Sequence, residues 1–133
     1  MKSWLVVIRI AAIAALLSLV IAAQKSDSIP KYDPATEVTL KGTVDDVRER
    51  ECPVSGGMGS HIVLRLSDDK TIEVHLASTK FVKAYDLVLV KGDKLEVTGS
   101  KVTFEGVETI FAREVKRGND TFAFRDKDGK PVW

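Results

Sequence analysis

The sequence has little of three things that would announce a function: one cysteine, two histidines and only 7% aromatic residues. A single cysteine, Cys52, cannot form an internal disulfide, so the core must hold without a covalent crosslink. The sequence also lacks any Ser–His–Asp or Cys–His signature and any phosphate-binding loop, and we therefore expect no enzymatic activity. With 133 residues, the chain has room for one domain.

Long hydrophobic runs are confined to the first 23 residues. Residues 5–8 and 10–23 are almost entirely apolar, and Arg9 separates the two stretches. The second stretch has the length of a signal-peptide core, and it ends at small residues, with cleavage expected after Ala22 or Ala23. The alternative is an uncleaved membrane anchor over residues 4–23, which would have to accommodate Arg9 in lipid. We expect residues 1–23 to be a signal peptide and the protein to be periplasmic or secreted, with membrane contact only if that segment stays attached.

An excess of positive charge is also missing. The chain carries 20 Lys and Arg against 19 Asp and Glu, and removing Lys2 and Arg9 with the signal peptide leaves 18 against 19. Sequence-independent binding to nucleic acid needs a surplus of basic side chains to replace counterions. We therefore expect no nucleic-acid partner.

What the sequence does contain is alternation of apolar and polar residues. A polar lead-in, residues 24–35, precedes a strand-like pattern from Thr36 that Gly42 interrupts in the manner of a bend. A Gly-rich loop is expected over residues 51–60, followed by a hairpin whose apolar positions are Ile62, Leu64, Leu66, Ile72, Val74 and Leu76. A short helix is expected over residues 78–86, and a second hairpin turns at residues 104–106.

Three strands, a short helix and two further strands are the arrangement of the OB (oligonucleotide/oligosaccharide-binding) fold, a five-stranded barrel. The sequence therefore predicts an all-β domain with one short helix, over residues 36–117, and residues 118–133 as a C-terminal extension docked on the barrel. A small β-sandwich is the rival, but its seven or so strands fit poorly into a segment of this length.

Three segments carry a resemblance to a known group of proteins. Residues 38–44 (Val-Thr-Leu-Lys-Gly-Thr-Val) and 91–99 (Lys-Gly-Asp-Lys-Leu-Glu-Val-Thr-Gly) resemble strands of secreted bacterial OB-fold families, and residues 112–115 with 124–133 resemble the end of small exported proteins. The periplasmic BOF family shares this plan. The resemblance covers about residues 32–133, and it implies a periplasmic binding or stress-related module with no catalytic residues to carry over.

The predicted second and third strands would form the ligand face of such a barrel. If the apolar positions of this hairpin point inward, the outer face presents His61, Val63, Arg65, Glu73 and His75. None of these is an aromatic residue on which a base would stack, which again disfavours single-stranded nucleic acid. Arg65 and Glu73 are expected to form at most an exposed ion pair.

The same geometry points to a metal. Keeping both apolar sets inside places His61 opposite or diagonal to His75, and Cys52 and Met58 lie in the loop that leads into His61. Cysteine, histidine and methionine together suit copper, and the first two residue types suit zinc. The simpler interpretation is a pair of hydrogen-bonded surface histidines.

These observations predict a non-catalytic exported binding module for a protein or small ligand, without a cofactor. A copper- or zinc-binding protein that uses His61, His75, Cys52 and Met58 is the second hypothesis. Binding of single-stranded nucleic acid or an oligosaccharide is the third.

Overall fold

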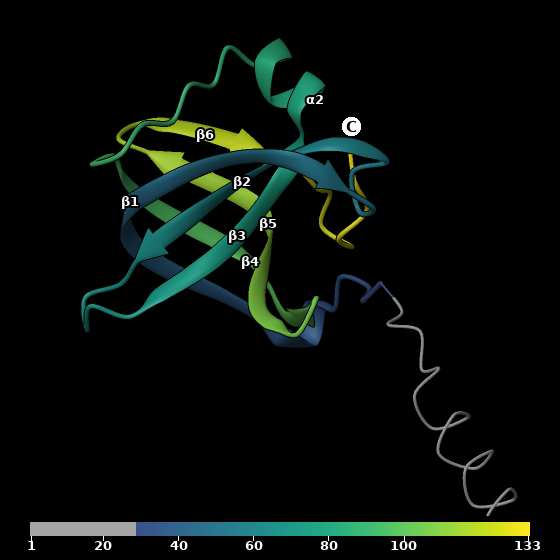
Figure 1. The fold of residues 1–133 in the computed structure, drawn as a ribbon, viewed down its shortest axis with the longest axis horizontal. Coiled ribbons are helices and arrows are strands. Elements are labelled where there is room, and N and C mark those ends of the chain that lie inside the picture. The colour runs from purple at the N-terminus through teal and green to yellow at the C-terminus, as the bar shows by residue number, and fades with distance from the viewer. Residues whose placement is uncertain (1–28) are drawn as a thin grey trace, which may run out of the picture.

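The computed structural model describes residues 29–133, and the predicted signal peptide lies outside them. The described chain is mostly antiparallel strand with one short helix (Figure 1). Its elements are η1 (Pro34–Thr36), β1 (Glu37–Cys52), β2 (Gly57–Arg65), β3 (Thr71–Ser78), α2 (Thr79–Ala84), β4 (Lys94–Phe104), β5 (Val107–Arg117) and β6 (Asp120–Ala123).

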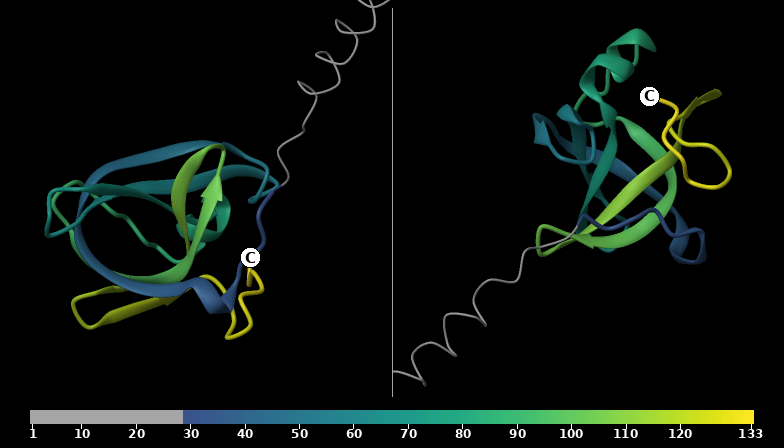
Figure 2. Two further views of the ribbon diagram at one scale, coloured as in Figure 1. Left: turned by 90° about the horizontal axis from the view of Figure 1, so that it is seen from below. Right: turned by 90° about the vertical axis from the view of Figure 1, so that its right-hand side faces the viewer.

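The strands form one sheet that closes on itself. Its order is β3-β2-β1-β4-β5-β6, and β3 also pairs in parallel with β5. The ring therefore runs β1-β2-β3-β5-β4 and back to β1, which is the closed five-stranded barrel expected from the sequence; Figure 2 (left) looks along it. The long strand β1 pairs with a different neighbour along each part of its length: residues 37–43 pair with β4, and residues 43–52 pair with β2.

As expected, the apolar side chains at alternate strand positions fill the barrel interior. The apolar positions of β2 and β3, Ile62, Leu64, Ile72, Val74 and Leu76, are buried together with side chains of β1, β4 and β5. The helix α2 follows β3 directly. The Ser78 hydroxyl caps it by accepting from the backbone N–H of Phe81, and Val82 packs into the core. No helix of residues 29–133 is long and apolar enough to cross a membrane.

Two glycines allow the small barrel to close, because neighbouring strands approach too near for a side chain. A Cβ at Gly42 would lie 2.5 Å from the carbonyl oxygen of Arg65, and one at Gly99 would lie 2.2 Å from that of Phe111. Gly99 lies at a bulge, where the register between β4 and β5 shifts. Closure thus depends on glycine at these two points of close approach.

The structure differs from the sequence-based expectation in the first hairpin. The loop predicted over residues 51–60 is mostly strand: β1 continues through Cys52, β2 begins at Gly57, and a turn of residues 53–56 joins them. Pairing of Cys52 with Gly57 holds the end of this hairpin in one register.

The chain after β5 packs on the barrel. Strand β6 pairs with β5, Phe124 is fully buried in the barrel core, and Trp133 packs against the same core. The lead-in is exposed at Ile29, whereas Tyr32 is half-buried and packs near Cys52 and Phe111. The two ends of the described chain thus meet near the far end of the first hairpin.

We expect Gly99→Ala to lower the free energy of unfolding by about 2–3 kcal/mol, because its Cβ would overlap the backbone of β5. The matched control is Gly57→Ala, whose Cβ would meet no described atom within 4 Å. Urea unfolding of both variants measures the difference. Equal stabilities would show that the barrel relaxes at Gly99 without cost.

Candidate metal centre

A bulge in β1 decides which of its side chains lie beside the histidines. Up to Val44, β1 pairs with β2 in one register, and from Asp46 onward the register is shifted by one residue. Beyond the shift, Arg48 lies opposite His61, Arg50 opposite Gly59 and Cys52 opposite Gly57. The alternation of strand side chains then places Cys52 on the outer face, with the histidines.

Cys52, His61 and His75 converge on this face. His61 lies directly opposite His75 in the β2–β3 register, as expected. Their ring centroids are 4.8 Å apart and the rings are nearly perpendicular, at 88°. One ligand atom from each of the three residues lies within 4.8 Å of the others, and all three side chains are buried.

The ring nitrogens of this cluster are short of partners. Ser55, in the hairpin turn, has its Oγ 2.9 Å from His75 Nε2. His75 Nδ1 and both nitrogens of His61 find no hydrogen-bond partner among residues 29–133. A Glu73 carboxylate oxygen lies 3.3 Å from His61 Nδ1 but is not aligned for a hydrogen bond. Buried polar atoms without partners are costly, so these nitrogens are available to another group.

A second, smaller core borders the cluster on one side. Cys52 packs with Phe104 and Phe111, and the half-buried Tyr32, Val54 and Val102 pack against them. It lies outside the barrel, where β5, the β4–β5 hairpin and the lead-in meet. The outer face of β2 and β3 is therefore partly covered.

The C-terminal tail forms another wall. The Trp133 ring centroid lies 6.0 Å from that of His75. Arg125 is 6% exposed, and its guanidinium carbon lies 5.0–5.5 Å from the ring centroids of Tyr32, Phe111 and Trp133. Cation–π contacts of this kind hold a buried guanidinium in place.

Burial keeps both histidines neutral. Loss of hydration and then the charges of His61, Arg125 and Arg50 together lower the pKa of His75 to about 3. Burial also lowers the pKa of His61, followed by the charge of Arg50, while Glu73 opposes this shift. A neutral imidazole keeps the lone pair that a metal ion requires.

Gly59 allows the cluster to be this tight. A Cβ at this position would lie 2.9 Å from the Cβ of Cys52, 2.6 Å from Ser55 Oγ and 3.2 Å from His61 Nε2. Any side chain here would push the ligand atoms apart. The glycine that the sequence suggested as part of a flexible loop is instead a packing requirement.

Two expectations about the ligand face are wrong. Met58 does not join the cluster: it follows Gly57 and precedes Gly59, which faces the cluster, so alternation turns Met58 away, and it is 45% exposed. The histidines also do not lie on an exposed face, since both have 0% exposure under the second core.

The remaining residues of the predicted ligand face do not form one site with the histidines. Val63 is half-buried, and Arg65 is exposed and pairs with Asp45 at 2.9 Å rather than with Glu73. Glu73 instead lies 3.4 Å from Arg50. Sequence reasoning missed Arg50 and Ser55 because it expected a mobile loop from residue 51 onward and therefore did not continue the strand face of Arg50 to Cys52. The sequence signal that could have placed Arg50 is the alternation of Arg48, Arg50 and Cys52, which puts all three side chains on one face of a continuing strand.

The chemistry of the cluster is that of a thiol and two neutral imidazoles. Thiolate and imidazole are the donors that zinc and copper prefer, and three such ligands leave a fourth position open. Metal–ligand bonds of about 2.0–2.3 Å put tetrahedral ligands about 3.3–3.8 Å apart, so donor atoms that now lie up to 4.8 Å apart would have to approach by at most about 1.5 Å. Magnesium and calcium, which require oxygen ligands, do not suit it.

The comparison with protein families gives one match. The model of the MamS/MamX magnetosome protein family matches residues 36–122, more than half of the chain. The matched segment includes Cys52, His61 and His75. No curated protein matches the chain. The family match does not name the BOF family, so the resemblance to that family stays a prediction.

The metal-free protein should lose stability as the pH falls below about 6.5, the ordinary value for histidine. The folded-state pKa of His75 lies near 3 and that of His61 is also lowered, so the unfolded chain binds more protons in this range and protonation favours unfolding. Each affected histidine contributes a slope of about 1.4 kcal/mol per pH unit. Urea unfolding in chelator at pH 7.5, 6 and 5 measures it. A His61→Gln/His75→Gln variant should show a flatter profile, and an equally steep one would contradict the assignment.

Proposed function

The chain belongs to the MamS/MamX magnetosome protein family, and we propose that this member binds one copper or zinc ion through Cys52, His61 and His75. The observation that carries the proposal is the burial of three nitrogen atoms of two imidazoles without hydrogen-bond partners among residues 29–133, next to the only cysteine. An ion coordinated by these residues would supply a missing partner for at most two of those atoms, one on each ring.

Second-sphere contacts support a metal site. A histidine that binds a metal through one nitrogen usually donates its other N–H to a carboxylate or a carbonyl. Glu73, 3.3 Å from His61 Nδ1, needs only a small rotation to accept this hydrogen bond, which leaves Nε2 to the ion on the side of Gly59. Ser55 holds His75 Nε2 in the metal-free protein and must release it if that nitrogen coordinates the ion.

A binding role without catalysis fits the surroundings of the site. The cluster lies among aromatic side chains, with Phe104 and Phe111 packed against Cys52 and Trp133 beside His75. The wider expectation of a protein or small-ligand partner applies to the rest of the surface, and binding of nucleic acid to the outer face of β2 and β3 is disfavoured by its cover.

The test is titration of the metal-free protein with Zn(II), Cu(I) and Cu(II) under competition with a chelator of known affinity. We expect one ion per chain. Cys52→Ser, His61→Gln and His75→Gln should each weaken binding at least about 100-fold, since each removes one of three ligands. Co(II) as a substitute for zinc should give a thiolate-to-metal charge-transfer band that Cys52→Ser abolishes.

Met58→Ala is the matched control, because Met58 belongs to the same hairpin but is exposed and turned away from the cluster. It should bind as tightly as the wild type. Circular dichroism of each variant shows whether it has folded. Folded ligand variants that bind as well as the wild type would contradict the site, and loss of binding in Met58→Ala would restore the four-ligand hypothesis.

We also infer from the N-terminal pattern that the protein is exported. Residues 5–8 and 10–23 have the composition of a signal peptide. N-terminal sequencing of the protein from cells of its source should show a chain that begins after Ala22 or Ala23. A chain that begins at Met1 and remains with the membrane fraction would instead favour the uncleaved anchor.

A further inference from the structure

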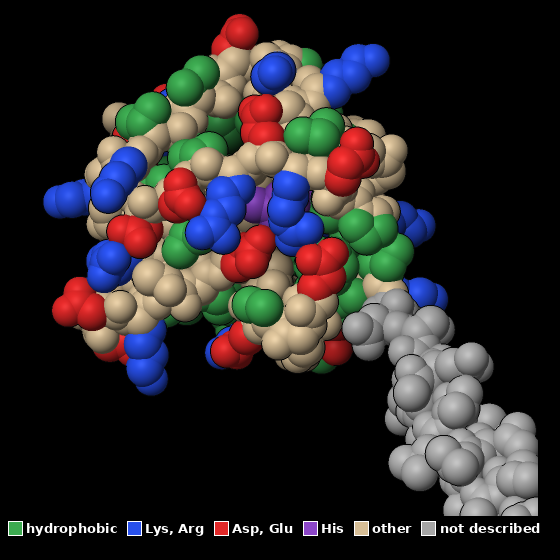
Figure 3. Space-filling model, viewed as in Figure 1, with side chains coloured by type: hydrophobic (Ala, Val, Ile, Leu, Met, Phe, Trp, Pro, Cys, Tyr) green, Lys and Arg blue, Asp and Glu red, His purple; other side chains and the backbone are tan. Residues whose placement is uncertain are grey.

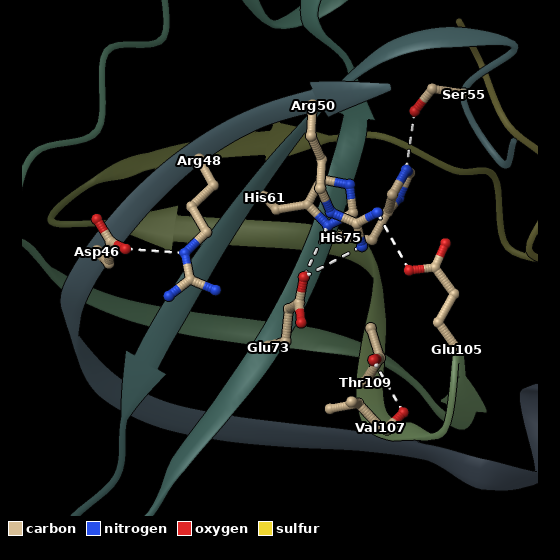
Figure 4. Close-up of polar contacts among 10 residues, drawn as sticks. All are labelled: Asp46, Arg48, Arg50, Ser55, His61, Glu73, His75, Glu105, Val107 and Thr109. Carbon is tan, nitrogen blue, oxygen red and sulfur yellow. Dashed lines mark hydrogen bonds and ion pairs between the residues drawn. The ribbon is translucent and has the colours of Figure 1, made fainter. Parts of the chain in front are cut away.

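Arg50 bridges two carboxylates directly over the proposed metal site. It extends from the end of β1, and its guanidinium lies 3.4 Å from Glu73 on β3 and 3.2 Å from Glu105 in the β4–β5 turn. Glu73 in turn lies 3.3 Å from His61 Nδ1. Figure 4 shows Arg50 above the two imidazoles, between Glu73 and Glu105.

The other walls of the site are packed side chains, whereas this side is polar and partly exposed. The Arg50 side chain is 35% exposed, that of Glu73 19% and that of Glu105 50%. Figure 3 shows a histidine between basic side chains with acidic ones beside them, on the face drawn in Figure 1. Long charged side chains reorient without disturbing the core, so this polar side offers an ion a route from solvent to His61 past Arg50.

A guanidinium and a bound metal ion repel each other at this distance. Arg50 lies opposite Gly59 in the β1–β2 register, and its guanidinium contacts Glu73, which lies 3.3 Å from His61 Nδ1. A metal ion on these imidazoles would be repelled by that guanidinium, and a poorly hydrated site does not screen this repulsion well. When Arg50 turns outward, Glu73 and Glu105 lose their partner and face the ion instead.

We propose that the Arg50 guanidinium occupies the entrance of the metal site in the metal-free protein and closes the route to His61, and we call it the resident cation. An incoming metal ion displaces Arg50 from Glu73 and Glu105. These two carboxylates then act as an acidic entry port for the ion. This inference rests on the metal site proposed above. It makes ion binding and the Arg50 ion pairs mutually exclusive, so that the closed position of Arg50 lowers the affinity of the site by linkage.

Arg48 offers a matched control. It precedes Arg50 by two residues on the same face of β1, lies across from His61 in the register, and carries the same charge. Its guanidinium, however, is paired with Asp46 at 2.8 Å and contacts neither Glu73 nor Glu105. Replacing either arginine by glutamine therefore removes the same charge from the same strand, but only one replacement opens the port.

The experiment measures the affinity and association rate for Zn(II) of the wild type, Arg50→Gln and Arg48→Gln, by chelator competition and stopped-flow mixing. We expect Arg50→Gln to bind about tenfold more tightly, through faster association, as a coupling of ordinary size predicts. Arg48→Gln should stay within about twofold of the wild type. Arg50→Lys keeps the positive charge and should stay closer to the wild type than Arg50→Gln.

Three other results would contradict either the role of Arg50 or the metal site itself. If the wild type binds Zn(II) but the two glutamine variants behave alike, Arg50 is not the resident cation. If Arg50→Lys binds as tightly as Arg50→Gln, charge displacement is wrong. If the wild type binds no Zn(II), Cu(I) or Cu(II), the metal site itself fails, and this result is separate from the comparison of the arginine variants.

Discussion

Closure of the barrel depends on the parallel pairing of Glu73, Val74 and His75 with Thr109, Ile110 and Phe111. Val74 and Ile110 meet inside, where both are fully buried. The same contact sets His75 beside Phe111 on the outer face, with ring centroids 5.6 Å apart. One pairing therefore completes the barrel core and also brings His75 beside Phe111 of the second core outside it. The remaining walls of the candidate site, including the C-terminal tail, are built around this point.

One register shift and one regular pairing determine which side chains meet in the cluster. The bulge in β1 between Val44 and Asp46 brings Cys52 to the outer face. The regular pairing of residues 61–65 with residues 71–75 places the two histidines directly opposite each other. A strand displaced by one residue turns each side chain to the other face. Without the bulge in β1, the Cys52 side chain would point into the barrel as that of Val44 does, away from both imidazoles. The ligand set therefore depends on a local irregularity in a regular sheet.

The two buried histidines affect the stability of the metal-free protein and of the proposed metal-bound protein in opposite directions. Buried without enough hydrogen bonds, they lower the stability of the metal-free protein, and they remain neutral because protonation there is unfavourable. The proposed ion would turn this cost into binding free energy, and Arg50 would hold the site closed until it arrives. The barrel core, which packs independently on the other face of β2 and β3, provides the stability that such a site requires.

Much of the fold could be read from the sequence, because alternation along residues 61–76, the turn residues and the Ser78 cap are local signals, and they predicted the strand order and the helix. The sequence alone also determined that His61 and His75 would be neighbours, since both strands had to turn their apolar residues inward. It did not determine the exposure of these histidines, the exclusion of Met58, or the roles of Arg50 and Gly59. Those depend on a bulge in β1 and on contacts with Phe104, Phe111 and Trp133, far away in the chain. Only the tertiary structure decides such matters, because burial and register shifts arise from long-range packing that no local pattern records.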